Sequence, residues 1–317
     1  MNRTQQADLL DRAAARAEPR LRAAFAASLD RLAAAVPRRR LRDALARRDD
    51  REALSILILA IEAEPFRPLE AAMRGALADS GRLVATEITP TILRKRAPFA
   101  FDPFAAADTA RAWINPVVRR LLDTVPAVAR YVLDAGRRAG MSAARLAEAL
   151  LGSLGLTMRQ AEGAQRLRAN LESTAVEVAQ AVARGDADAA RAALTRRPDP
   201  VVVERSLSRF RRRATQTRAL LLGTDQARRA ASLAAELVWR QAVDEGLIAG
   251  AVKVWHHRGD ARVRDAHVTI PGLNQGGVPL DQSFYSNLGF IRFPLDPEAP
   301  LANVAGCRCY LTYEARR

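Results

Sequence analysis

Apolar side chains recur every three or four residues along most of the chain, which is the spacing of helices that bury one face. In the segment 201–222 this apolar stripe consists of Val203, Leu207, Phe210 and Ala214. After Gly246 the pattern changes, because residues 251–256 and 308–313 alternate as half-buried strands do. The pattern therefore predicts a mainly α protein, in which a long Ala- and Arg-rich helical body precedes a small, loop-rich α+β C-terminal module with short strands.

Capping residues mark where several helices are expected to begin. Ser142 caps one helix, and Thr157 with Gln160 three residues later forms a capping box for the next. Thr224 and Asp225 are expected to cap the last long helix, so that a break separates it from the preceding one.

Four prolines are expected to bound or interrupt helices, because proline lacks a backbone N–H and cannot continue the helical hydrogen-bond pattern. Pro19 is placed at a helix start, Pro37 at a helix end, and Pro116 and Pro126 at interruptions. Residues 86–104 contain three further prolines and three phenylalanines, and they are expected to form an irregular arm.

The same boundaries divide the chain into three predicted parts. Residues 1–139 form a helical N-terminal region, residues 140–246 a second helical region, and residues 247–317 a compact C-terminal module. Eight of the 17 glycines lie between Gly246 and Gly306, which is why the module is expected to be rich in loops.

The chain carries a formal charge of +15, from 50 Lys and Arg against 35 Asp and Glu, and only Lys95 and Lys253 are lysines. Residues 251–317 hold 8 basic and 6 acidic residues, so +13 of the charge belongs to residues 1–250. An arginine excess suits a polyanionic partner, since guanidinium groups bind phosphates through paired hydrogen bonds. It equally follows from a GC-rich genome, which enriches Ala and Arg together.

The sequence contains no stretch of about 18 apolar residues, so no transmembrane helix is expected. Residues 1–5 lead into a charged helical pattern without an apolar signal core, which predicts a cytoplasmic protein. Two cysteines one residue apart, Cys307 and Cys309, do not form a disulfide framework.

One helix face is a candidate for nucleic-acid binding. Arg205, Arg209 and Arg212 fall on a single face of the helix that carries the stripe described above, with Arg211 and Arg213 beside them. We favour a solvated helix face for these charges, and a strip that lies on the phosphates of DNA is the alternative.

Residues 142–171 form a second candidate for DNA binding, because two short helices joined by a glycine-containing turn resemble a helix-turn-helix. Only Arg159 and Gln160 of the second helix are suited to base contacts. Sequence-specific binding by this hairpin is therefore the weaker hypothesis, since a recognition helix usually presents several such side chains.

The rare histidines and cysteines gather near the C-terminus, as His256, His257, His267, Cys307 and Cys309. Imidazole and thiolate are the usual ligands of zinc, and small loop-rich modules often need such a site for stability. His267, Cys307 and Cys309 are therefore candidate ligands of a zinc ion.

The fourth ligand of this candidate site could be His256, His257 or Asp260, and Asp260 is the one we retain. The alternative to metal binding is a pair of reduced, part-buried thiols beside a histidine that hydrogen-bonds loop backbone.

A hydrolytic enzyme is a second functional class. A metal-dependent nuclease centre would need carboxylates to hold hard cations near phosphate, and only Asp260 and Asp265 lie close to the histidines in the sequence. The chain also lacks a Gly-rich phosphate loop, a serine nucleophile motif and a paired-carboxylate motif. We therefore expect a protein without enzymatic activity.

The C-terminal motifs resemble those of the phage Mu F-like proteins, which are also described as head morphogenesis or minor head proteins. That family typically has a tryptophan, the pattern D-x-R-x-R-x-x-H, a glycine and the pattern N-C-R-C after a long helix. The matching residues here are Trp255, Asp260, Arg262, Arg264, His267, Gly272, Asn303, Cys307, Arg308 and Cys309. Gly306 stands where the family usually has Asn. The resemblance covers residues 140–317 and is only compositional before them.

The resemblance implies a non-enzymatic, structural minor capsid protein of a tailed phage or prophage. Such a protein is expected to act with the portal protein and with the major capsid or scaffold proteins during head morphogenesis, and to contact phage DNA without sequence preference. It would be found in the host bacterial cytoplasm during assembly, and in the virion inside the head or near the portal. The alternative is a metal-dependent nuclease or toxin-like DNA-processing enzyme that uses the C-terminal module.

Overall fold

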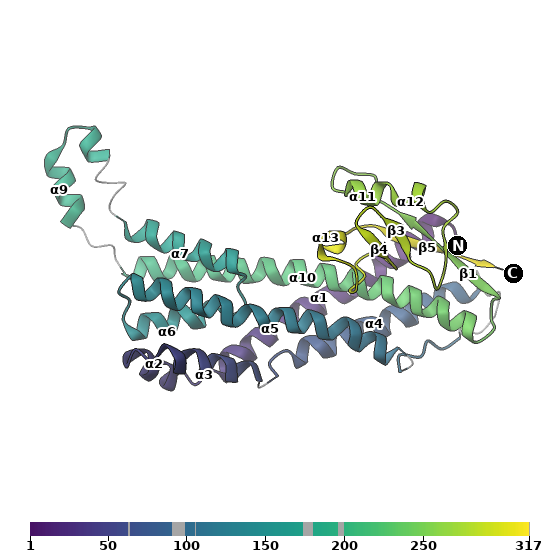
Figure 1. Ribbon diagram of the computed structural model, residues 1–317, viewed down its shortest axis with the longest axis horizontal. Coiled ribbons are helices and arrows are strands. Elements are labelled where there is room, and N and C mark those ends of the chain that lie inside the picture. The colour runs from purple at the N-terminus through teal and green to yellow at the C-terminus, as the bar shows by residue number, and fades with distance from the viewer. Residues whose placement is uncertain (63, 91–98, 105, 174–179, 196–199, 317) are drawn as a thin grey trace. The chain divides into compact units, whose positions relative to one another are not determined.

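The computed structural model of residues 1–317 describes all of them except residues 63, 91–98, 105, 174–179, 196–199 and 317. Most described residues are helical, which confirms the mainly α prediction (Figure 1). The helices of the body are α1 (Arg3–Ala35), α2 (Arg38–Ala46), α3 (Asp50–Glu62), α4 (Arg67–Ile88), α5 (Ala107–Arg138), α6 (Ala143–Leu151), α7 (Met158–Glu172), α9 (Ala187–Thr195) and α10 (Pro200–Asp244). Among the described residues, no helix combines the length and the apolar character needed to cross a lipid bilayer.

Short strands follow α10, as the alternating pattern predicts. β1 (Gly250–His256) is the centre of a three-stranded antiparallel sheet, with β2 (Val278–Pro279) on one side and β5 (Tyr310–Arg316) on the other. A separate hairpin consists of β3 (Phe284–Ser286) and β4 (Gly289–Ile291). The short helices between these strands are α11 (Asp265–Val268), α12 (Ile270–Leu273) and α13 (Leu301–Val304). The C-terminal region is therefore the predicted loop-rich α+β module.

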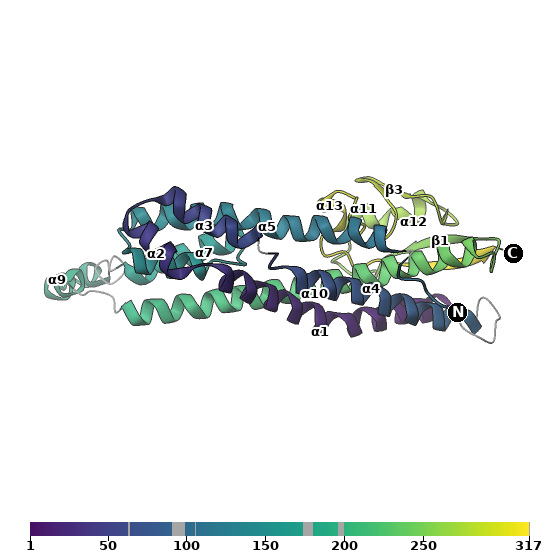
Figure 2. The ribbon, with the colours of Figure 1, turned by 90° about the horizontal axis from the view of Figure 1, so that it is seen from below.

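β5 is an edge strand, and a side chain of the first helix occupies part of its free edge. The Gln6 side-chain amide donates to the carbonyl oxygen of Tyr313 at 3.1 Å and accepts from the backbone N–H of Tyr313 at 2.8 Å. These are the two hydrogen bonds that a neighbouring antiparallel strand would make. The side chain of Arg3 also donates to the hydroxyl of Tyr310 at 3.0 Å. The start of α1 and the end of β5 therefore lie side by side (Figures 1 and 2).

The chain forms two compact units. The first unit comprises Met1–Ser28, Phe66–Arg119 and Ala219–Arg317, and the second comprises Leu29–Pro65 and Arg120–Arg218. The helices α1, α5 and α10 each contribute residues to both units. The units are thus assembled from separated segments, whereas the sequence pattern suggested three consecutive parts.

Three of the four prolines do not bound or interrupt helices, so the predictions at these positions were wrong. α1 continues through Pro19, and α5 continues through Pro116 and Pro126. A proline inside a helix costs about 3 kcal/mol, and burial of a continuous apolar face offsets this cost. In α5 the buried face includes Trp113, Ile114, Val118, Leu121, Val125 and Val128. Pro37 does separate α1 from α2, as predicted.

The described residues include only part of the predicted arm over residues 86–104. α4 continues to Ile88, so the segment begins as helix. Residues 91–98 lie outside the described residues, and residues 99–104 contain neither helix nor strand.

A single helix, α10, covers Pro200–Asp244, so the predicted break before Thr224 was wrong. Gly223 lies inside this helix, where an added Cβ atom would come within 2.5 Å of Cγ of Arg22 in α1. The glycine therefore allows α1 and α10 to approach closely within the first unit. This contact offsets the cost of glycine in a helix, which is about 1 kcal/mol relative to alanine.

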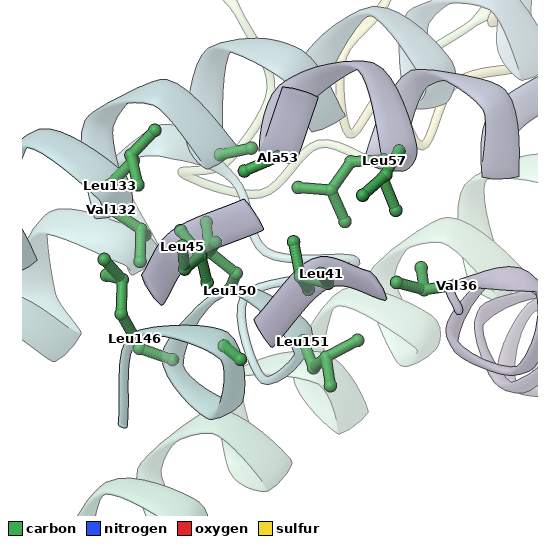
Figure 3. Close-up of a cluster of buried hydrophobic side chains, with 14 of the residues drawn as sticks. Val36, Leu41, Leu45, Ala53, Leu57, Val132, Leu133, Leu146, Leu150 and Leu151 are labelled. Atoms are coloured by element: carbon green, nitrogen blue, oxygen red, sulfur yellow. The ribbon is translucent and has the colours of Figure 1, made fainter. Parts of the chain in front are cut away.

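The second unit has a core of aliphatic side chains, and those labelled in Figure 3 come from α2, α3, α5, α6 and the α1–α2 junction. The residues labelled there are Val36, Leu41, Leu45, Ala53, Leu57, Val132, Leu133, Leu146, Leu150 and Leu151. Both predicted caps that begin helices of this unit are confirmed. The Ser142 hydroxyl accepts the backbone N–H of Arg145, and Thr157 and Gln160 form the reciprocal bonds of a capping box.

Gly155, in the turn between α6 and α7, has a φ of +80°, and an added Cβ atom would lie 2.6 Å from Cδ1 of Leu29. Gly155→Ala is expected to destabilise the protein by about 2–3 kcal/mol, because left-handed backbone strain adds to overpacking. Gly185→Ala is the matched control, since Gly185 has a φ of +70° with nothing within 4 Å of the added atom. Urea unfolding measures both changes, and equal losses would contradict the role assigned to the Leu29 contact.

Candidate metal centre

Three of the predicted ligands meet in the first unit. His267 lies on α11, and Cys307 and Cys309 lie in the loop that leads into β5. Nδ1 of His267 is 3.4 Å from Sγ of Cys307 and 3.5 Å from Sγ of Cys309. Within the part of the chain that the structure describes, this is the one group of His, Cys, Asp or Glu side chains with metal-ligand spacing, and its ligand atoms all lie within 4.8 Å.

These distances fit a tetrahedral zinc ion. With Zn–S bonds of about 2.3 Å and Zn–N bonds of about 2.05 Å, a tetrahedral angle places nitrogen and sulfur about 3.6 Å apart. The observed N···S distances of 3.4 and 3.5 Å are close to that value. Thiolate sulfur and imidazole nitrogen are typical zinc donors, whereas magnesium and calcium take oxygen ligands.

A chain of hydrogen bonds fixes the orientation of the His267 ring. The Ser286 hydroxyl donates to the carbonyl oxygen of Gly289 at 2.7 Å and accepts from the side-chain amide of Asn303 at 3.2 Å. The amide oxygen of Asn303 therefore faces Nε2 of His267, at 2.8 Å, and accepts its proton. Nδ1 therefore faces the two sulfur atoms, where it can bind a metal once it carries no proton.

The loop that carries the cysteines turns at Gly306, which has a φ of +62°. The side chain of Arg264 donates to the carbonyl oxygen of Ala305. The backbone N–H of Cys307 donates to the carbonyl oxygen of Val304 at 3.0 Å. Glycine and asparagine are the two residues that most readily adopt this left-handed conformation. The glycine at position 306 therefore suits this turn.

The three side chains are coupled through shared protons. The hydrogen bond with Cys309, assisted by His267, lowers the pKa of Cys307 to about 5. The same interaction with Cys307 raises the pKa of Cys309. Burial is the largest single influence on the pKa of His267 and lowers it, but the hydrogen bond and charge of Cys307 and the hydrogen bond with Asn303 together outweigh burial, so the pKa is raised. Metal binding here would release protons, so metal affinity is expected to fall with falling pH.

Trp255 lies against the centre. Its ring centroid is 5.4 Å from that of His267 and 5.4 Å from that of Phe284, both in edge-on geometry. The indole N–H is buried and meets no partner with good hydrogen-bond geometry among the described residues. It nevertheless lies close enough to Cys309 to oppose the rise in the pKa of that thiol. Trp255 therefore covers one side of the His267 ring and places its indole N–H near the sulfur of Cys309.

Asp260, the predicted fourth ligand, is not part of the three-residue group. Its carboxylate pairs with the guanidinium of Arg308 and accepts the backbone N–H of Arg262 at 3.0 Å. Its pKa is lowered mainly by Arg308. The exposed pair joins the D-x-R-x-R motif to the Cys-Arg-Cys motif, which gives Asp260 and Arg308 a role in closing the loop.

The other two histidines also lie apart from the group. Nε2 of His256 is 2.8 Å from the hydroxyl of Thr312, and its ring stacks on that of Tyr310 at 5.2 Å between centroids. Nδ1 of His257 accepts the backbone N–H of Gly259 at 3.1 Å. Both side chains are thus occupied by loop and sheet contacts.

The protein is expected to lose stability as the pH falls from 6.5 toward 4, because of His256. Burial, with Arg3 and His257 nearby, lowers the pKa of His256 to about 4. Between these pH values the unfolded chain binds the proton and the folded chain does not, so unfolding is favoured by acid. Partial solvent exposure limits the effect to about 1–2 kcal/mol. Urea midpoints at pH 7 and 4.5 should differ less in His256→Gln than in the wild type, and an equal difference would refute this role.

The remaining motif residues serve the loops around the centre in different ways. Arg264 and Asn303 make the hydrogen bonds described above, and Arg262 is exposed. Gly272 lies in α12 with open space around it, and nothing in the structure explains a glycine there.

The candidate DNA-binding arginines lie in the part of α10 that belongs to the second unit. Arg205, Arg209, Arg212 and Arg213 are exposed, as a solvated or phosphate-binding face requires. Arg211 differs, because its side chain packs at Gly152, where an added Cβ atom would come within 2.8 Å of the guanidinium. Burial lowers the pKa of Arg211. Arg211 is therefore part-buried, whereas the other four arginines are exposed.

The helical hairpin over 142–171 is present as α6 and α7. Gln160, one of its two candidate base-contacting residues, donates to the carbonyl oxygen of Ala214 at 3.1 Å and caps its own helix. This side chain is therefore committed to packing inside the second unit, and only Arg159 remains exposed.

Asp225 is a residue of this site that the sequence reasoning missed, because it was assigned to a helix cap. It lies inside α10, and the backbone N–H of Gly306, next to Cys307, lowers the pKa of its carboxyl group. Burial raises the pKa of Asp225, and the nearby Cys307 sulfur adds to that rise. The contact joins positions far apart in the chain, so no local sequence signal could have indicated it.

Comparison with known proteins gives no match: no family model, no curated protein and no solved structure is found to be similar to this chain. The likeness to the Mu F-like proteins therefore rests on the motif residues alone.

Proposed function

We propose that this protein is a non-enzymatic, structural minor head protein of a tailed phage or prophage, stabilised by a zinc ion in its C-terminal module. It would assemble with the portal protein and with major capsid or scaffold proteins in the host cytoplasm, and remain in the virion near the portal or inside the head. The proposal depends on the motif resemblance and on the contacts that the motif residues make in the structure.

One observation carries the proposal: the buried residues of the motif bind one another. His267, Cys307 and Asn303 are buried and joined by hydrogen bonds, and Trp255 covers them. Motif residues that satisfy one another in this way are suited to holding a loop-rich module in one shape. Residues of an active site would instead converge on space for a substrate.

The donor set weighs against the nuclease alternative. Phosphodiester cleavage with metal ions uses carboxylates that hold hard cations. Here the clustered donors are two sulfurs and one imidazole, and the neighbouring Asp260 is paired with Arg308. Incubating the purified protein with plasmid and Mg²⁺, Mn²⁺ or Zn²⁺ tests the alternative, and cleavage that is lost in a His267→Ala variant would favour it over the structural role.

Assembly is tested by co-expressing the protein with the portal and capsid proteins of the phage or prophage that encodes it. We expect it to co-purify with the portal protein and to appear in purified particles by mass spectrometry. Its absence from both would refute the proposal. A Cys307→Ser/Cys309→Ser variant is expected to be lost from the particles, since the module would no longer hold its shape.

Non-specific DNA contact is the secondary part of the proposal, and the exposed α10 arginines support it. The test measures the slope of log DNA affinity against log salt concentration. If each of the four arginines contacts one phosphate, replacing all four by glutamine should make this slope less steep by about 3.6. The replaced residues are Arg205, Arg209, Arg212 and Arg213. The matched control replaces four exposed arginines of α5, namely Arg119, Arg120, Arg130 and Arg138. Equal slopes in the two variants would assign the contact to net charge alone.

A further inference from the structure

Arg211 lines a cavity in the second unit. The cavity has a volume of about 600 Å³, and its lining residues come from the end of α1, the first residue of α2, α6 with the turn that follows it, and α10. All of them belong to the second unit. Leu151, which Figure 3 shows in the core, lines the cavity on its apolar side. The other polar lining residues are Arg38, Arg145, Glu148, Glu204 and Ser208.

The guanidinium of Arg211 is partly withdrawn from solvent and lacks a partner. Its Nε atom is buried and has no hydrogen-bond partner within the described part of the chain. The side chain lies against the turn after α6, because an added Cβ atom at Gly152 would come 2.8 Å from its Nη1 and 3.1 Å from its Cδ. A charged group that is withdrawn from water without a partner is costly, so an anion beside it would stabilise the protein.

The carboxylate that attracts Arg211 most strongly, that of Glu204, is held by another arginine. Arg168 is 2% exposed, and its guanidinium donates to Glu204 at 2.6 Å and to Glu172 at 3.2 Å. The guanidinium of Arg145 lies 4.0 Å from the same oxygen of Glu172. Three arginines thus share two carboxylates, which leaves positive charge around the cavity.

The lining groups indicate the chemistry of a ligand. Three guanidinium groups line the cavity against two carboxylates, one of which Arg168 already holds. A carboxylate ligand is flat and carries one charge, so it pairs well with a single guanidinium. The tetrahedral oxygens of a phosphate group accept from several directions, and arginine binds them through paired donors. The hydroxyl of Ser208 offers a further donor.

We propose that this cavity is a binding site for a phosphate group, in which Arg211 makes the buried contact and Arg38 and Arg145 hold the outer oxygens. Free phosphate and the backbone of a nucleic acid are the two sources of such a group. The inference goes beyond the function proposed above, because it depends neither on the metal centre nor on the four exposed arginines of α10.

Calorimetric titration of the full-length protein with inorganic phosphate, at constant ionic strength, tests the site. Arg211→Gln is expected to weaken phosphate binding by about tenfold or more, because it removes a charged donor of paired hydrogen bonds. Arg130→Gln is the matched control, since it removes one exposed arginine of the same unit and should change the affinity by less than about twofold. Wild-type protein that binds no phosphate, or an Arg211→Gln affinity within about twofold of the wild type, would overturn the inference.

The stability of the variants gives a second readout. In phosphate-free buffer Arg211→Gln should resist urea at least as well as the wild type, because it removes an unpaired charge, whereas loss of a purely structural arginine would lower the urea midpoint. Arg38→Gln alters an exposed residue and should weaken phosphate binding by about threefold without loss of stability. If Arg211→Gln does not fold, an unchanged phosphate affinity in Arg38→Gln overturns the inference.

Competition distinguishes the sources of the phosphate group. A short DNA duplex should displace inorganic phosphate from the wild type if a nucleic-acid backbone supplies the group, and should leave it bound if free phosphate is the ligand. A peptide of four glutamates tests the carboxylate alternative. If this peptide binds more tightly than phosphate, and Arg211→Gln abolishes its binding, the phosphate assignment is wrong.

Discussion

Replacing Cys307 and Cys309 together by serine is expected to remove zinc from the protein and to lower the midpoint of thermal unfolding by about 10 °C. A metal present at about 1,000 times its dissociation constant stabilises the folded state by about 4 kcal/mol. For a chain of this size each kcal/mol corresponds to about 2–4 °C. The effect is large because the two cysteines join the Cys-Arg-Cys loop to His267 of α11.

Metal analysis and differential scanning calorimetry, with and without a chelator, check this prediction. The chelator should lower the midpoint of the wild type but leave that of the double variant unchanged. The control is Asp260→Asn, which alters an exposed carboxylate outside the ligand group and should keep about one zinc per chain. Wild-type protein that contains no zinc and is indifferent to the chelator would contradict the prediction.

Glu236→Ala is expected to destabilise the protein by about 3–5 kcal/mol, because it leaves a buried ammonium group without its counter-charge. Oε1 of Glu236 lies 3.0 Å from Nζ of Lys253 and 2.9 Å from the guanidinium of Arg240, and its other oxygen accepts the hydroxyl of Tyr313 at 3.3 Å. The side chain of Lys253 is 0% exposed and that of Glu236 is 3% exposed. The positive charge of Lys253 is therefore compensated by Glu236 and not by solvent.

Two further variants distinguish the loss of the buried charge pair from the effect of shortening a glutamate side chain. Glu18→Ala is the matched control, since Glu18 lies 3.7 Å from Arg22 in an exposed pair on a helix and should cost less than about 1 kcal/mol. The double variant Glu236→Leu/Lys253→Met should recover most of the stability, because it removes both buried charges. Chemical unfolding measures all three proteins. A Glu236→Ala loss no larger than that of Glu18→Ala would contradict the buried-pair interpretation.

Helical periodicity and capping residues were sufficient to predict much of the body, because both act within a few residues of the chain. Ser142 and Thr157 begin helices as expected, and Pro37 separates two of them. The same local rules failed at Pro19 and at Thr224, where long-range burial decides the outcome. A proline or glycine that stops an isolated helix is tolerated when a continuous face of that helix packs against its neighbours.

Only part of the candidate metal centre could be predicted from the sequence. His267, Cys307 and Cys309 could be proposed from residue type alone, because imidazole and thiolate have few equivalents as zinc ligands. Carboxylates are common, so neither sequence distance nor residue type distinguishes Asp225 from Asp260. Only the fold shows that one lies beside Cys307 and that the other is paired with Arg308.

The hydrogen bonds between Gln6 and Tyr313 also bear on how the protein is made. At about 5–20 residues per second, a ribosome needs about 15–60 s to add the 307 residues that separate these partners. During that interval the apolar face of α1, which includes Leu9 and Leu10, cannot contact the sheet that it meets in the finished protein. The first unit can therefore close only after translation of β5, and the nascent chain is expected to depend on chaperones until then.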